Sequence, residues 1–135
     1  MVAALAAHHG EVAEASAEAL GRQFFAPGAA AWLAALVAAA ADGRLVGYAV
    51  LLKGLQVDAA EPVVTLEHLH VAAGARGQGI GTALLAAAAE QGRAWGCAAL
   101  GVAARADNAG AQRFYERRGL KGRPRGGIAY RMPLR

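Results

Sequence analysis

Cysteine is nearly absent from this sequence, since Cys97 is the only one in 135 residues. A single thiol cannot build an internal disulfide framework, and this usage fits a reducing cytoplasm. Long runs of strongly apolar residues are absent too. The hydrophobic share of 56% is high mainly because the sequence is rich in alanine, which buries little surface per residue. We therefore expect no membrane-spanning helix. No Lys or Arg precedes Arg22, so the N-terminus is not typical of a secretory signal.

Charge is sparse as well, at 18% charged residues and a net charge of +4. That charge is too small to predict a nucleic-acid partner by itself. It is unevenly distributed, because eight of the 14 basic residues lie between Arg113 and Arg135, against one acid, Glu116. The C-terminal segment is therefore suited to face an anion. No repeat or linker breaks the chain, so we predict one domain over residues 1–135.

The pattern of apolar residues predicts helices and strands of one mixed sheet. Asp42-Gly43 predicts a hairpin turn, which favours strands on both of its sides. The expected strands are Leu36–Ala41, Leu45–Leu52, Val63–Val71, Ala98–Ala103 and one or two closing strands within Leu120–Leu134. The expected helices lie within the first 25 residues, over about Gly79–Trp95, and from a cap at Asp107 or Asn108 to Gly119.

A glycine-rich turn, from Arg76 to Thr82, joins an expected strand to an expected helix. Converging backbone N–H groups and the positive end of the helix dipole make such a turn an anion site suited to a pyrophosphate. It is not a Walker P-loop, because no lysine is near. It also misses the dinucleotide fingerprint, because Thr82 stands where the third glycine belongs. The turn alone leaves open a plain helix start with flexible glycines.

A second pair of residues bears on the function. Asn108 and Tyr115 are seven residues apart and share one face of the expected last helix. Taken singly, Asn108 is explained as a helix cap and Tyr115 as a core residue. Placed after a strand that follows the glycine-turn helix, the pair favours a functional role.

These segments resemble one family. Arg76-Gly-Gln-Gly-Ile-Gly81 matches the Arg/Gln-x-x-Gly-x-Gly/Ala acetyl-CoA motif of the GNAT superfamily of N-acetyltransferases, and Asn108–Leu120 is similar to its following Asn…Phe-Tyr-Glu…Gly-Phe motif. The resemblance covers about Leu36–Leu120. It implies an α/β fold with a single mixed, mostly antiparallel sheet and helices on both faces. The first strand of the family is short or missing here, because only about 35 residues precede the hairpin.

The resemblance also implies an activity and its residues. The expected reaction is acetyl transfer from acetyl-CoA to a primary amine of a small molecule or peptide, without a metal. Tyr115 takes the position of the general acid that protonates the leaving thiolate. The residues expected to bind acetyl-CoA are Leu69, His70, Val71, Arg76, Gly77, Gln78, Gly79, Ile80, Gly81, Thr82, Asn108 and Tyr115.

Glu67 is the candidate general base, with a structural or substrate-charge role as its alternative. By strand parity it shares a face with Thr65 and Leu69, and His68 and His70 point to the other face unless a β-bulge changes the count. Simple packing is the alternative role of the two histidines. In the family branch that acetylates ribosomal proteins the base lies on the later strand. Here that strand has no carboxylate, which argues against this branch.

Three further expectations complete the prediction. A catalytically idle CoA-binding module is the main alternative function, and a nucleic-acid binder using the Arg-rich C-terminus is less favoured. No metal is expected, because His68 and His70 supply two ligands at best. A homodimer is expected, with the segment Ile128–Met132 as a natural participant.

Overall fold

The computed structural model describes residues 17–135, and the chain divides into two compact units, residues 1–103 and 104–135. The first unit opens with α2 (Ala17–Phe24) and a 3-10 turn, η1 (Ala29–Ala31). The predicted N-terminal helix is thus found from residue 17 onward, and its earlier part lies outside the described residues.

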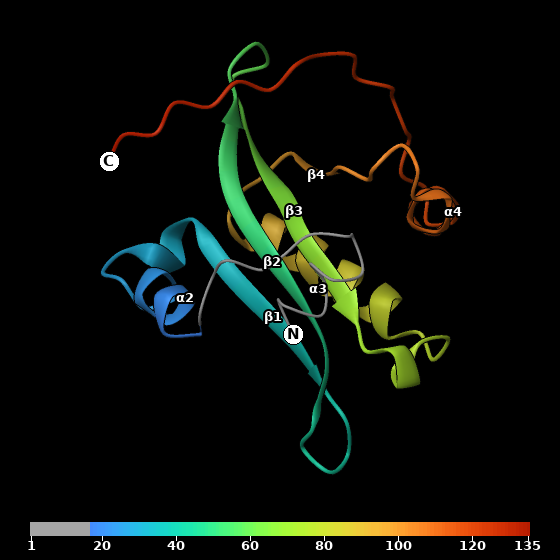
Figure 1. Ribbon diagram of the computed structural model, residues 1–135. Helices are drawn as coiled ribbons and strands as arrows, with labels where there is room; N and C mark the ends of the chain where they lie inside the picture. Colours follow the sequence, from blue (N-terminus) through green and yellow to red (C-terminus); the bar gives the residue numbers. More distant parts are fainter. Residues whose placement is uncertain (1–16) are drawn as a thin grey trace. The chain divides into compact units, whose positions relative to one another are not determined.

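The core of the first unit is an open sheet of four strands in the order β1-β2-β3-β4 (Figure 1). The strands are β1 (Leu33–Ala39), β2 (Leu45–Gln56), β3 (Glu61–Val71) and β4 (Ala99–Val102). The first three pair antiparallel, and β4 pairs parallel to β3. The prediction of one mixed, mostly antiparallel sheet is confirmed.

The predicted hairpin turn lies between β1 and β2. Gly43 has a φ of 83°, and the Arg44 N–H donates to Asp42 Oδ1 at 3.0 Å. The strand that this turn predicts before it, over Leu36–Ala41, is therefore found, and it begins earlier than predicted, since β1 runs over Leu33–Ala39. The second hairpin is longer than predicted. Because β2 and β3 pair as far as Gln56 with Glu61, Pro62 belongs to a strand and not to a loop.

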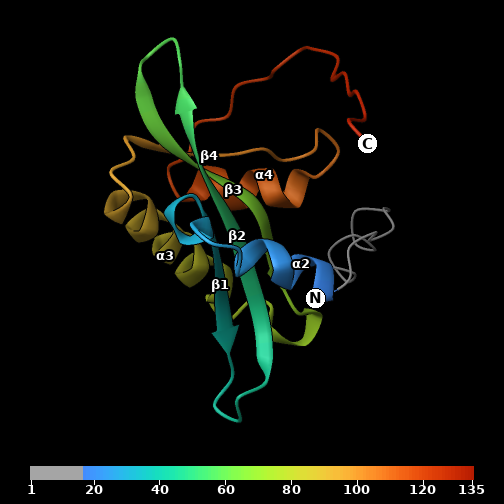
Figure 2. The same cartoon turned by 90° about the vertical axis from the view of Figure 1, so that its left-hand side faces the viewer.

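Helix α3 (Ile80–Ala94) covers one face of the sheet, whereas α2 lies beside β1 (Figure 2). Helix α3 buries Leu84, Leu85 and Ala88 against the strands. Two glycines permit this close packing. A Cβ at Gly92 would stand 2.6 Å from Val64 Cγ1, and one at Gly47 would stand 2.9 Å from the His70 carbonyl oxygen.

The second unit contains α4 (Ala109–Arg117), followed by Gly119 with a φ of 86°. Of the two predicted caps, Asp107 and Asn108, it is Asn108 that caps this helix. The prediction of closing strands in residues 120–134 is wrong, because no strand forms there. Apolar residues do alternate along this segment, and their side chains are 78–91% exposed. A strand needs a neighbour for its hydrogen bonds, and no described segment pairs with this one. The alternating residues are Ile128, Tyr130, Met132 and Leu134.

None of the helices within residues 17–135 is both long enough and apolar enough to cross a membrane.

Candidate functional site

Strand β3 contains a bulge at Glu67. Val50 pairs with His68 and the next residue, Leu51, pairs with Leu66, so Glu67 has no partner on β2. A bulge shifts the alternation of side chains beyond it by one residue. The predicted grouping of side chains is therefore wrong from Glu67 onward.

The bulge decides which face each residue of β3 occupies. Val64 and Leu66 face α3 before the bulge, and Leu69 and Val71 do so after it, because they pair with residues of β2 on the α3 side. His68 and His70 take the opposite face. The histidines therefore share a face with Thr65, which is the reverse of the simple parity count.

Strand β4 leaves β3 at the bulge. Their parallel ladder runs from Val63 with Ala99 to Leu66 with Val102 and then ends. The segment Glu67–Val71 therefore has β2 on one side and no described strand on the other. We refer to Glu67–Val71 as the open edge of β3.

At the open edge, the backbone N–H and C=O groups of every second residue point away from β2. The Ala72 N–H donates to the Val46 carbonyl at 2.8 Å, so hydrogen bonds to β2 fall on alternate residues, and Leu69 and Val71 face outward. Arg76 Nε donates to the Val71 carbonyl at 3.0 Å. An extended ligand with amide groups can pair with such an edge as an added strand does.

The glycine-rich turn follows the open edge directly. A 3-10 turn, η2 (Ala73–Ala75), leads to Gly77 and Gly79, which have φ values of 78° and 79°. Gly79 is the N-cap of α3 and supplies no side-chain hydrogen bond, so no cap covers the N–H groups of Ile80 and Gly81. The turn is exposed. An exposed helix N-terminus of this kind binds anions.

The predicted acetyl-CoA residues of the first unit thus lie on one continuous path. Glu67 is exposed at the bulge, where the open edge begins. The path continues along Leu69, His70 and Val71, passes through the turn, and ends in the first turn of α3. The residues of that last part are Arg76, Gly77, Gln78, Gly79, Ile80, Gly81 and Thr82.

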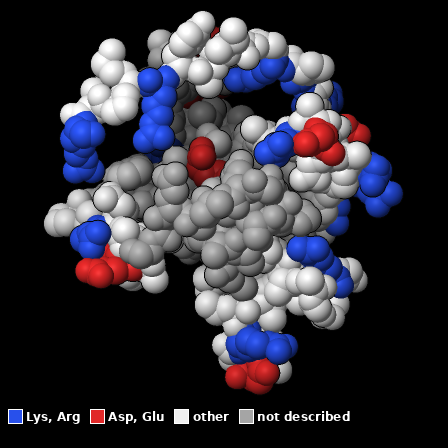
Figure 3. Space-filling model, viewed as in Figure 1, with Lys and Arg blue, Asp and Glu red and all other residues white. Residues whose placement is uncertain are grey.

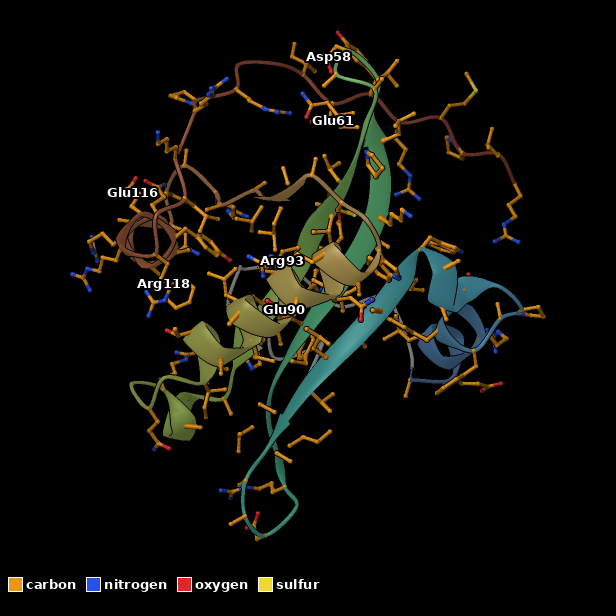
Figure 4. All side chains as sticks on the ribbon, turned by 180° about the vertical axis from the view of Figure 1, so that it is seen from behind. Asp58, Glu61, Glu90, Arg93, Glu116 and Arg118 are labelled. Atoms are coloured by element: carbon orange, nitrogen blue, oxygen red, sulfur yellow. The ribbon has the colours of Figure 1, made fainter. Side chains whose placement is uncertain are left out.

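The two remaining predicted residues lie in the second unit. Asn108 Oδ1 accepts a hydrogen bond from the Ala111 N–H at 3.0 Å, so the capping role proposed as its alternative is observed. Tyr115 is half-buried on α4, and burial raises the pKa of its phenol. The rings of Tyr115 and Phe114 meet edge to face, with their centroids 5.2 Å apart. Glu116 lies on α4, and Arg118 is its C-cap residue, whose guanidinium carbon lies 3.7 Å from the centroid of the Phe114 ring (Figure 4).

Beyond α4 the second unit is basic. Lys and Arg side chains follow the C-terminal segment (Figure 3), and no acid occurs in the sequence after Glu116. The exposed basic residues of this segment are Lys121, Arg123, Arg125, Arg131 and Arg135.

Sequence reasoning missed two residues of β2. Gly47 pairs with Val71 and lies under Ile80 and Leu84, so it lets the start of α3 approach the sheet. A glycine inside a strand pattern was the available signal of such an approach. Tyr48 pairs with His70 on the other face, and no sequence signal distinguished it from a core residue.

Within residues 17–135 no group of three or more His, Cys, Asp or Glu side chains is placed to hold a metal ion.

Comparison with known sequences agrees with this geometry. The family model of the acetyltransferase (GNAT) family matches residues 6–120. Uncharacterized N-acetyltransferases of Mycobacterium bovis and Mycobacterium tuberculosis are each 34% identical over 87 residues, which is 64% of this chain and 53% of the relative. The chain thus spans about half the length of the curated relatives it matches.

Solved structures give the same result. An aminoglycoside N-acetyltransferase, AAC(6')-Iy in complex with CoA, is 28% identical with a TM-score of 0.67 and covers 76% of this chain and 77% of its own. A transcriptional regulator from Bacillus halodurans is 26% identical with a TM-score of 0.66, and the match covers 73% of this chain and 65% of the regulator. An integron cassette protein from Vibrio cholerae shares the fold, at 23% identity and a TM-score of 0.74. That match covers 98% of this chain and 82% of the cassette protein. With its family model matched along most of its length, the chain belongs to the GNAT family of acetyltransferases.

Proposed function

We propose that the protein transfers the acetyl group of acetyl-CoA to the primary amine of a small molecule or peptide, with both substrates bound together. The observation that carries this proposal is the continuity of the open edge of β3 with the uncapped N-terminus of α3. One ligand that joins an amide-bearing arm to a pyrophosphate matches both halves of that path.

Acetyl-CoA is such a ligand. In the proposal its pantetheine arm pairs with the outward backbone groups of Leu69 and Val71, and its pyrophosphate lies on the amides of Gly77–Thr82. Asn108 contacts the pantetheine side. The complex of the similar aminoglycoside N-acetyltransferase with CoA supports CoA as the donor.

The chemistry follows from a thioester and an amine. The neutral amine nitrogen attacks the thioester carbonyl carbon, a C–N bond forms, and the oxyanion is stabilised by a backbone N–H of the open edge. The C–S bond then breaks, and the thiolate of CoA takes a proton from Tyr115. No covalent enzyme intermediate is needed. Because burial raises the pKa of Tyr115, its phenol holds a proton throughout the neutral range.

The amine must lose a proton, and we assign this step to Glu67. Its position at the bulge puts a carboxylate at the start of the open edge. His68 is the adjacent exposed titratable side chain and is the matched control. Glu67→Gln is expected to lower kcat at least about 100-fold while His68→Gln changes it little. The reverse order of effects would assign the base to His68.

A catalytically idle CoA-binding module is the second candidate, because such a module would keep the same path. Transfer of label from acetyl-CoA to a panel of amines separates the two functions. The panel contains polyamines, amino acids, aminoglycosides, N-terminal peptides and simple monoamines. Labelled product confirms the proposed enzyme. CoA binding with no product from any amine would support the idle module.

We also propose a homodimer that works in the cytoplasm, with residues 1–135 acting as one catalytic unit. The lone Cys97 fits a reducing compartment. The exposed apolar row from Ile128 to Leu134 supports association, because side chains of this kind favour burial. Light scattering tests the dimer: a mass near 13.7 kDa at every micromolar concentration would show a monomer.

A further inference from the structure

One side chain of α4 holds the loop that precedes this helix. The loop, residues 104–108, contains no helix or strand and is exposed apart from the half-buried Asn108. Gln112 donates from its side-chain Nε2 to the carbonyl oxygens of Arg105 and Ala106, at 2.9 Å and 3.0 Å. A side-chain amide has two N–H donors, so these two hydrogen bonds use both of them.

Backbone hydrogen bonds tie Asn108 into the same arrangement. The Asn108 N–H donates to the Arg105 carbonyl at 3.0 Å, and the Gln112 N–H donates to the Asn108 carbonyl at 3.1 Å. The Arg105 carbonyl therefore accepts from the backbone of Asn108 and from the side chain of Gln112. Together these bonds fix the backbone of Asn108 relative to the first turn of α4.

The side-chain bonds of Gln112 do not belong to the helix itself. The cap at Asn108 satisfies the Ala111 N–H, and the Gln112 N–H has its helical partner in the Asn108 carbonyl. Both bonds from Gln112 Nε2 reach loop carbonyls that precede the helix. Their effect is therefore on the position of an exposed loop, a kind of segment that is mobile when nothing holds it.

The side chain of Asn108 has one end occupied. Its Oδ1 accepts from the Ala111 N–H at 3.0 Å, which determines which end of the amide is the oxygen. Its Nδ2 has no hydrogen-bond partner among residues 17–135. The end of Asn108 that can meet a ligand is therefore a donor, and a carbonyl oxygen is its match.

Resting on the proposed function, in which Asn108 contacts the pantetheine side, we infer that Gln112 is a positioning residue for acetyl-CoA. Its two hydrogen bonds fix the loop backbone and so keep Asn108 Nδ2 in place to donate to an amide carbonyl of the pantetheine arm. Gln112 acts through Asn108 and does not itself contact the ligand.

Titration calorimetry with CoA as the probe tests this inference. Gln112→Met removes the amide donors and keeps the length and helix preference of the side chain. Gln23→Met makes the same change at an exposed position of α2. Gln112→Met is expected to raise the Kd of CoA about fivefold, the factor that matches the loss of one net hydrogen bond, while Gln23→Met leaves it unchanged. The KM of acetyl-CoA should rise by the same factor, with kcat at saturating acetyl-CoA changed less than about twofold.

A double-mutant cycle separates positioning from plain stabilisation of the loop. Asn108→Ser removes the proposed donor and keeps a residue that caps helices well. Gln112→Met added to Asn108→Ser should raise the Kd of CoA no further, because both changes act on one contact. The Tm of each variant, measured alongside, reports a loss of stability separately from a loss of affinity.

Two results would overturn the inference. A wild-type Kd in Gln112→Met, whether or not its Tm falls, would leave Gln112 with a structural role alone. A full fivefold effect of Gln112→Met in the Asn108→Ser protein would show that Gln112 does not act through Asn108. Both outcomes leave acetyl transfer intact, whereas a wild-type protein that neither binds CoA nor acetylates any amine would overturn the proposed function as well.

Discussion

Gly47 of β2 lies against the backbone of His70 so closely that a Cβ on it would stand 2.9 Å from the His70 carbonyl oxygen. The same Cβ would stand 3.2 Å from Leu84 Cδ1 and 3.3 Å from Ile80 Cγ2. The absence of a side chain at position 47 therefore allows the start of α3, and with it the glycine-rich turn, to approach the sheet.

Gly47→Ala should destabilise the protein, because the carbonyl oxygen belongs to a paired strand and cannot move aside alone. The expected loss is about 1–3 kcal/mol in the free energy of unfolding, measured by chemical denaturation. Gly54→Ala in the same strand is the control, since nothing lies within 4 Å of its added Cβ. Equal stability of the two variants would contradict this packing.

Gly79→Val should weaken CoA binding. Gly79 has a φ of 79°, which valine adopts at a cost, and it occupies the N-cap position of the helix end proposed to hold the pyrophosphate. Gly43→Val imposes the same strain, at a φ of 83°, in the β1–β2 turn. Calorimetry should show lower CoA affinity for Gly79→Val alone, although both variants lose stability. A Gly79→Val protein with wild-type affinity would remove the pyrophosphate from this turn.

Tyr115→Phe should lower kcat by about 10²- to 10⁴-fold, because the ring keeps its packing while the proton donor is lost. Binding of acetyl-CoA should change little. The steady-state rate with saturating acetyl-CoA is the measurement, with Tyr130→Phe as the control. A variant that turns over as fast as the wild type would transfer the donor role to water or to another residue.

Stability should fall as the pH rises above 10. Burial raises the pKa of Tyr48 and of Tyr115 above the ordinary value of 10.0, so the unfolded chain loses these protons before the folded one. The contribution of the neutral phenols is complete below pH 10 and is lost as the pH passes through their folded pKa values. Denaturation between pH 8 and 11 should show this fall, and Tyr48→Phe should reduce it. A Tyr48→Phe protein with the wild-type pH dependence would contradict the burial effect.

The sequence predicts local elements well where the chemistry is local. Asp42-Gly43 specifies its hairpin, Asn108 its helix cap, and the glycines of the turn the start of α3. Each of these depends on a backbone conformation or a hydrogen bond within a few residues, which a single sequence contains.

Features that depend on partners were less predictable. The bulge at Glu67 follows from the register between β2 and β3, so counting along one strand put His68 and His70 on the wrong face. The alternation from Ile128 to Leu134 has the period of a strand but no described neighbour to pair with. The unpartnered hydroxyl of Tyr48 likewise appears only when its surroundings are known.

Amide NMR shifts on titration with CoA test most directly the claim that the open edge of β3 and the glycine-rich turn form one binding path. The largest shifts are expected on Leu69, Val71 and the amides of Gly77–Gly81, with Gly43 and Gly54 unchanged as internal controls. Binding of CoA that leaves the open edge and the turn unshifted would contradict it.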